Sequence, residues 1–167
     1  MRLSSRFAAI LLAAVALFAS KASAAPATTA PNPAPAFVGG ASAGRNIPLS
    51  SLRGKPVVLL FSPSPRDGAF RKQCRELRGC YERLAAQGII CFAAFTNQGG
   101  RIPSNIPFVT ANDPAAVASA YDVQGRFAVA VIGIDGNLDC LSTKPLPGYR
   151  VLDLIMNNAG MQARLRR

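Results

Sequence analysis

The sequence predicts an α/β domain built on a mixed β-sheet, on the evidence of three features. Two continuous apolar runs, at 57–61 and 89–95, have the length of strands and suit strands that are buried on both faces. Between them, apolar residues recur at helical spacing, which predicts an amphipathic helix and a right-handed βαβ unit. Asp135-Gly136 is a two-residue hairpin signal that predicts two antiparallel strands further along the chain. We therefore expect a central four-stranded mixed sheet, with two parallel strands and a hairpin, flanked by helices.

Signals for the helices lie between these strands. The first helix is predicted from a stripe of apolar residues, and Gly88 ends it; the stripe consists of Phe70, Cys74, Leu77, Tyr81 and Leu84. Asp113-Pro114 places an N-cap before a proline at the first helical position, so a short helix should run to about Tyr121. A last helix follows Pro147 and should stop near Gly160.

The hairpin strands are expected at 129–134 and 137–141, on either side of Asp135-Gly136. The predicted order is thus β-α-β-α-β-β-α, which is the topology of the thioredoxin core.

Several short motifs carry a resemblance to known families. Residues 47–61 resemble the N-terminal part of extracytoplasmic thioredoxin-like and peroxiredoxin-like proteins, and 106–113, 121–123 and 132–137 resemble the second half of peroxiredoxins. Closer still, the chain is similar to the DUF4174 family, an exported peroxiredoxin-like branch without an established activity. That similarity rests on Phe61-Ser62-Pro63-Ser64-Pro65, Gln73, Val131–Gly136 and Met161-Gln162-Ala163-Arg164.

The N-terminal segment predicts export. Arg2 and Arg6 precede the apolar run 7–18, and Ala22-Ser23-Ala24 is a small-x-small cleavage pattern, so residues 1–24 are interpreted as a signal peptide. An uncleaved membrane anchor is the alternative, although the run is shorter than the ~20 residues of a bilayer span. After cleavage we expect no transmembrane span and a periplasmic or secreted protein.

The mature chain divides into two parts. Residues 25–44 are rich in Ala, Pro, Thr and Ser, which predicts a disordered tether, and 45–167 form the thioredoxin-like domain.

Composition narrows the possible chemistry. The chain has no histidine, which excludes Ser-His-Asp and Cys-His sites and histidine-ligated metals. We expect no metal site and no cofactor.

Three of the 19 basic residues and none of the 8 acidic ones lie in the signal segment, so the formal net charge falls from +11 to +8 on cleavage. This balance favours anionic envelope components or a membrane surface as partners, and the lack of aromatic residues among the arginines argues against nucleic acid.

The place where the family keeps its redox site contains no cysteine. Thioredoxin-like enzymes carry the nucleophilic thiolate at the start of the helix after the first strand, where this chain has Ser62–Gly68. The resemblance to peroxiredoxins places the peroxidatic position near Phe70 and its assisting hydroxyl near Asp67, and the loop of the thioredoxin cis-proline corresponds to 126–128. No residue is therefore predicted to be catalytic by the usual mechanism.

Four cysteines remain, at Cys74, Cys80, Cys91 and Cys140. Exported thiols usually pair, and Cys80–Cys91 is the most attractive disulfide because both flank the Gly88 turn. Cys140 would then pair with Cys74 or stay free. A pair of small apolar core residues is the alternative interpretation of Cys74 and Cys91.

Two functional hypotheses follow. In the first, the domain is a non-catalytic binding or accessory protein of the bacterial envelope, with an anion-contact face formed by Arg71, Lys72, Arg75 and Arg78. In the second, it is an atypical thiol oxidoreductase or peroxidase that uses Cys74, with Cys80 or Cys91 as the resolving partner. A purely structural domain held near a partner by its tether, with a merely solvated basic surface, is the remaining alternative.

Overall fold

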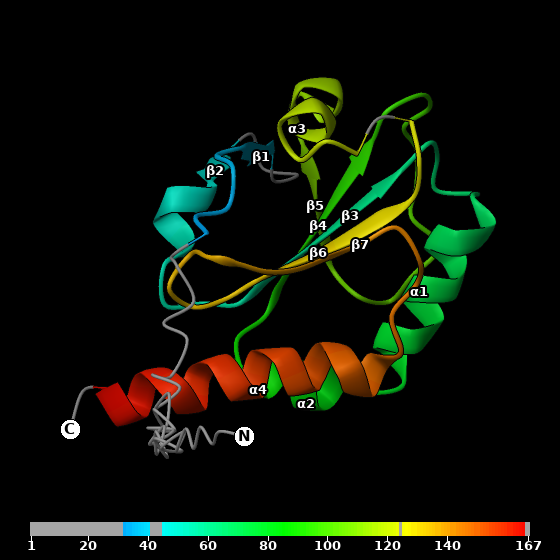
Figure 1. The fold of residues 1–167 in the computed structure, drawn as a ribbon. Coiled ribbons are helices and arrows are strands. Elements are labelled where there is room, and N and C mark those ends of the chain that lie inside the picture. Colours follow the sequence, from blue (N-terminus) through cyan, green and yellow to red (C-terminus); the bar gives the residue numbers. More distant parts are fainter. Residues whose placement is uncertain (1–31, 41–44, 124, 166–167) are drawn as a thin grey trace, which may run out of the picture. The chain divides into compact units, whose positions relative to one another are not determined.

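The computed structural model describes residues 32–40, 45–123 and 125–165. A seven-stranded sheet runs through them in the order β2-β1-β5-β4-β3-β6-β7 (Figure 1). The strands are β1 Val38–Gly40, β2 Asn46–Pro48, β3 Val57–Ser62, β4 Ile90–Phe95, β5 Phe108–Ala111, β6 Ala128–Ile132 and β7 Leu138–Ser142. The helices are the 3-10 turn η1 Leu49–Leu52 and α1 Gly68–Arg78, α2 Tyr81–Ala86, α3 Pro114–Ala120 and α4 Gly148–Leu165.

The four strands that the sequence predicts form the centre and one edge of this sheet. β3 pairs in parallel with β4, with Val57 opposite Ile90, and antiparallel with β6. β6 in turn pairs antiparallel with β7. The βαβ unit and the antiparallel hairpin strands are therefore confirmed, and β3 lies between β4 and β6.

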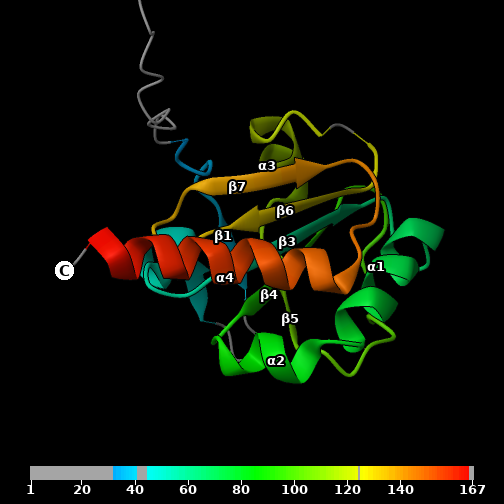
Figure 2. The ribbon, with the colours of Figure 1, turned by 60° about the horizontal axis from the view of Figure 1, so that its bottom comes forward.

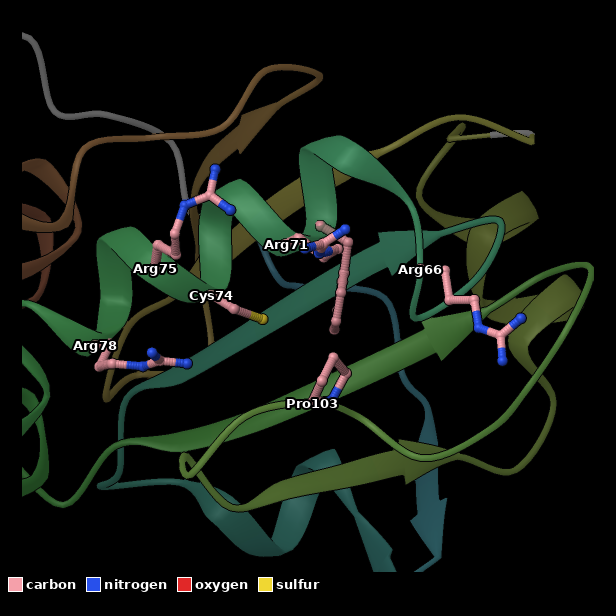
Figure 3. A pocket seen from close by; sticks show the side chains of 7 residues that line it. Arg66, Arg71, Cys74, Arg75, Arg78 and Pro103 are labelled. Carbon is pink, nitrogen blue, oxygen red and sulfur yellow. The ribbon is translucent and has the colours of Figure 1, made fainter.

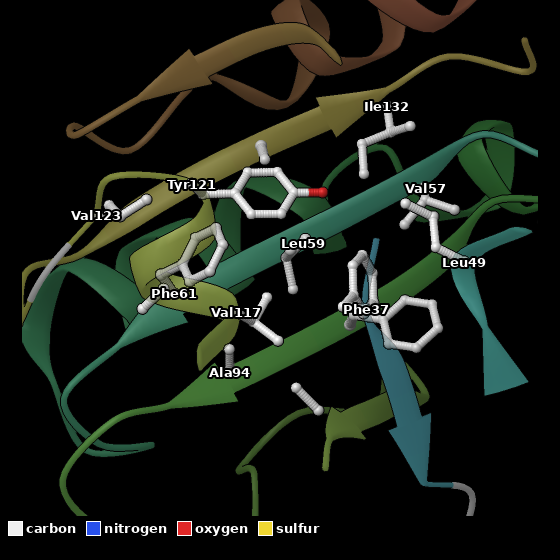
Figure 4. Close-up of a cluster of buried hydrophobic side chains, with 14 of the residues drawn as sticks. Phe37, Leu49, Val57, Leu59, Phe61, Ala94, Val117, Tyr121, Val123 and Ile132 are labelled. Carbon is white, nitrogen blue, oxygen red and sulfur yellow. The ribbon is translucent and has the colours of Figure 1, made fainter. Parts of the chain in front are cut away.

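Residues of β3 point alternately into two apolar layers. Val57, Leu59 and Phe61 belong to the layer under α3, η1 and the N-terminal segment (Figure 4). Val58 and Leu60 belong to the layer that faces α1, α2 and α4. Figures 1 and 2 show α3 on one side of the sheet and the other three α-helices on the opposite side. Both faces of β3 are buried, as its continuous apolarity predicts.

The predicted first helix is broken into α1 and α2. Cys80 lies between them with a φ of −129°, outside the helical region, and its N–H donates to the Leu77 carbonyl three residues back. Gly79 favours a break here because glycine is a poor helix former. A β-carbon at Gly148 would overlap the Glu76 carbonyl oxygen, so the start of α4 approaches this break closely.

The N-terminal boundary of the domain differs from the expectation. Residues 32–40, assigned to the disordered tether, pack on the domain: Phe37 is buried and the Tyr121 hydroxyl donates to the Pro35 carbonyl at 3.0 Å. β1 is too short to give a sequence signal, and Gly39 is required because a β-carbon there would overlap the Phe92 ring. The rest of the predicted tether, 25–31 and 41–44, and the signal segment lie outside the described residues.

The C-terminal helix also differs, because α4 continues through Gly160 to Leu165. A glycine inside a helix costs only about 1 kcal/mol, so it is a weak stop signal without a second breaker. Among the described residues, no helix is long and apolar enough to cross a membrane.

Candidate functional site

An acidic side chain caps the helix at the turn between β3 and α1, where a thioredoxin-like enzyme would hold its nucleophile. The Asp67 carboxylate accepts hydrogen bonds from the N–H groups of Ala69 and Phe70 at 2.9 and 3.0 Å. Asp67 is thus the N-cap of α1, and it uses the amides that would otherwise stabilise a thiolate. The Ser62 hydroxyl donates to the Ser64 carbonyl within the same turn. This turn contains no cysteine, and the two amides that Asp67 caps are not free to bind an anion.

An open groove lies beside α1, with a volume of about 510 Å³ (Figure 3). Arg71, Arg75 and Arg78 line it from α1, and Arg66 joins them from the preceding turn. The remaining lining residues are Phe70, Cys74 and, from the loop between β4 and β5, Pro103. The groove is therefore lined by four arginine side chains and by apolar residues between them.

The groove agrees only in part with the predicted anion-contact face. Arg71, Arg75 and Arg78 are brought together because positions i, i+4 and i+7 share one side of a helix. Lys72 is exposed but does not line the groove, since it lies about 100° around the helix from Arg71. Arg66, which belongs to the same basic stretch of the sequence, also lines the groove. Helical spacing alone could have excluded Lys72.

The groove arginines lack carboxylate partners in the part of the chain that the structure describes. All eight acidic residues lie in that part, and the ion pair found there joins Arg150 and Asp153 at 2.9 Å, on α4. Glu76 is the acidic residue of α1, and its carboxylate turns to the Gly148 N–H at 3.4 Å. Positive charge is consequently concentrated in the groove without internal compensation.

The thiol at the groove floor is a poor nucleophile. Cys74 is 4% exposed, and burial raises the pKa of its thiol to about 11, against the lowering effect of Arg78. Burial and the neighbouring Cys74 raise the pKa of Cys91 to about 12. Both thiols are thus protonated at neutral pH, whereas a reactive cysteine has a lowered pKa.

All four cysteines are free in the structure. Sγ of Cys80 lies 3.5 Å from the Leu77 carbonyl oxygen and packs against Gly148 at the start of α4. Cys91 belongs to the same apolar layer as Cys74, and Cys74 is the cysteine whose charge affects it. The Cys80–Cys91 disulfide therefore stays a prediction. Burial also raises the pKa of Cys80 and of Cys140.

The structure gives no group of three or more Cys, Asp or Glu residues that could hold a metal ion within 32–40, 45–123 and 125–165. The loop 126–128, which corresponds to the cis-proline loop of thioredoxins, leads into β6 with Phe127 buried in the layer facing α1.

No family model matches the chain, and no curated protein matches it. The resemblance to the DUF4174 family therefore stays a prediction.

Solved structures match over most of the chain. A thiol:disulfide interchange protein from Bacteroides sp. has a TM-score of 0.62 at 19% identity, over 77% of this chain and 91% of that one. Thioredoxin peroxidase I of Plasmodium yoelii has a TM-score of 0.59 at 18% identity, over 81% and 92%. The pneumococcal exposed lipoprotein thioredoxin of Streptococcus pneumoniae has a TM-score of 0.57 at 14% identity, over 74% and 99%. At these identities the likeness is one of fold, and it confirms a thioredoxin-like α/β fold.

Proposed function

We propose that this chain is an exported thioredoxin-like domain that binds anionic ligands in the arginine groove and serves as a non-catalytic accessory protein of the bacterial envelope. The observation that carries the proposal is the set of four groove arginines without a carboxylate partner among the described residues. Guanidinium groups donate paired hydrogen bonds to carboxylates and phosphates, so an anion would compensate charge that the protein leaves unbalanced.

The thiol chemistry supports the same proposal. A thiol oxidoreductase needs a thiolate near neutral pH, but the pKa of Cys74 is raised to about 11 by burial. The Asp67 carboxylate also occupies the amides at the start of α1. Both features oppose the formation of a thiolate next to this helix.

Export of the chain is part of the proposal. Its support is the signal-like sequence of residues 1–24 and the structural similarity to an exposed lipoprotein thioredoxin. An envelope location would bring the basic groove into contact with anionic polymers and lipids.

A second candidate is an atypical thiol oxidoreductase or peroxidase that uses Cys74. It is favoured by the position of Cys74 in the lining of the groove and by the presence of Cys91 in the same apolar layer. Similarity to thiol:disulfide interchange proteins is compatible with it.

The test compares two variants that lose the same charge. Arg71→Ala/Arg75→Ala removes two cations from the groove, and Lys72→Ala/Arg83→Ala removes two exposed cations outside it. Calorimetric titration with inorganic phosphate and citrate at low ionic strength should show at least about tenfold weaker binding for the groove variant. Equal losses in both variants would mean that net charge, not the groove, attracts the anion.

A parallel assay separates the two candidates. Reduction of a small aromatic disulfide and consumption of peroxide are measured for the protein and for Cys74→Ala. No turnover is expected from either protein. Turnover that disappears in Cys74→Ala would establish the thiol enzyme instead.

A further inference from the structure

We propose that the ligand of the groove is a linear chain of phosphate groups that lies along the side of α1 and contacts Arg71, Arg75 and Arg78. This inference rests on the proposed anion-binding function and specifies its ligand. It is drawn from the length of the arginine row, the state of the helix N-terminus, the shape of the groove and the position of the exposed apolar residues.

The arginine row is longer than a single small anion. Side chains three or four positions apart on a helix are ~5–6 Å apart at their β-carbons, and seven positions rise ~10 Å along the axis. Arg78 and Arg66 lie at opposite ends of the groove in Figure 3. One phosphate could reach two neighbouring arginines of the row, but only an elongated ligand contacts all of them.

The start of α1 disfavours the binding of a single anion. A helix N-terminus binds phosphate through free N–H groups. Here the N–H groups of Ala69 and Phe70 already donate to the Asp67 carboxylate, which also adds a negative charge at that point. Side chains along the flank of the helix are therefore the better place to hold an anion.

The groove is concave, with α1 on one side and Pro103 from the β4–β5 loop on the other. A membrane surface is flat, and proteins that bind it combine cations with exposed apolar side chains. The large apolar residues that are exposed among the described ones lie elsewhere: Val38 in β1, Leu141 in β7, and Tyr149 and Met156 in α4. A chain that enters a groove fits this surface better than a bilayer does.

A phosphate chain also matches the charge pattern. Each unit of the chain carries an anionic oxygen, so consecutive units can meet consecutive arginines, and guanidinium groups bind phosphate oxygens in a paired geometry. The lack of internal carboxylates in the groove leaves these donors free for that contact.

The experiment titrates the full protein with orthophosphate, inorganic tripolyphosphate and a longer inorganic polyphosphate at several salt concentrations. The affinity should rise by about tenfold or more from orthophosphate to tripolyphosphate, and further for the long chain. The salt dependence should steepen with chain length, because each additional phosphate contact releases a counterion.

Single substitutions locate the ligand along the helix. Arg71→Ala and Arg78→Ala, at the two ends of the row, should each weaken binding of the long chain by about five- to tenfold and lower its salt dependence by about one ion. Lys72→Ala on the same helix, outside the groove, should weaken it by less than about twofold.

Other ligands provide the outcomes that would overturn the inference. Equal affinity for orthophosphate and for the long chain, with both lost in Arg71→Ala/Arg75→Ala, would leave an anion groove but reject an elongated ligand. Tighter binding of polyglutamate, of a single-stranded oligonucleotide or of phosphatidylglycerol vesicles would assign a different polyanion. A lack of binding to every anion at low salt would instead reject the proposed function itself.

Discussion

The two faces of the central sheet carry similar apolar layers but are covered in different ways. On the α3 face, residues 32–38 close the layer, and the rings of Phe37 and Phe92 pack edge to face with centroids 5.0 Å apart. On the α1 face, the layer is equally buried, yet an open groove with four arginines lies along its helix. The comparison teaches that one face of a sheet can be closed by packed rings while the other face keeps arginines without carboxylate partners among the described residues.

The largest effect on the free energy of unfolding is expected on the α3 face of the sheet. Phe37→Ala should lower the free energy of unfolding by about 3–5 kcal/mol, because it removes a buried ring and leaves a cavity next to Phe92. Urea denaturation measures this loss, and phosphate binding should stay unchanged. A change in affinity comparable to that of Arg71→Ala would show that the two faces are not independent.

The free energy of unfolding at high pH should depend on the buried thiols of the α1 face. The pKa of Cys74 is about 11 in the folded protein against 9.0 for a free thiol, so the folded state resists the loss of this proton. Stability is therefore fully present below pH 9 and falls between pH 9 and 11, by about 1.4 kcal/mol per pH unit for this group. Cys74→Ala should reduce the slope of unfolding free energy against pH, whereas an identical slope would place the titration in other groups.

A smaller effect is expected on the side of α1 that faces away from the groove. The fully buried Gln73 amide donates to the Leu146 carbonyl at 3.0 Å and accepts from the Leu146 N–H at 2.7 Å. Gln73→Met keeps the volume but leaves both backbone groups unpaired, which should cost about 1–3 kcal/mol. Thermal unfolding, with the exposed Gln87→Met as the control, tests this expectation. Equal stability of the two variants would contradict it.

The smallest change in the free energy of unfolding is expected for the arginines of the groove. Arg71 and Arg75 are like charges four positions apart on α1, a pairing that destabilises a helix by ~0.2–0.5 kcal/mol. Arg75→Ala should therefore raise the free energy of unfolding by about 0.5 kcal/mol or less at low salt, and the gain should shrink as salt is added. A loss of more than about 1 kcal/mol would mean that Arg75 stabilises the fold.

Strong local signals explain which elements could be predicted. β3 and β4 have dense apolar runs and appear where expected. The hairpin around Asp135-Gly136 also forms, but its turn is longer than the two residues predicted, because β6 ends at Ile132 and β7 begins at Leu138. β1 and β2 have three residues each, and β1 joins the sheet through the long-range pairing of Gly39 with Ala111, which local composition does not record. β2 then pairs with β1. Phe37 lies in a proline- and alanine-rich segment whose packing depends on Phe92 and Tyr121.

Only the part of the candidate site that lies on α1 could be predicted, because it follows from helical spacing. Spacing along α1 groups Arg71, Arg75 and Arg78, and they do share the groove. The opposite wall at Pro103 comes from a loop about 30 residues away, so no local pattern reveals it. The position of Cys80 outside the helix was not predicted, although Gly79 is a local signal for the break because glycine is a poor helix former.

The Asp67 carboxylate at the start of α1 also affects electron exchange between this domain and thiol proteins around it. Thiol–disulfide exchange passes electrons through a thiolate that attacks a partner's sulfur. An incoming thiolate would meet the negative charge of Asp67 at the place where thioredoxin-like enzymes carry a reactive sulfur. Under the proposed non-catalytic function, this charge would repel such a thiolate, and the domain could reside among thiol oxidoreductases without exchanging electrons with them.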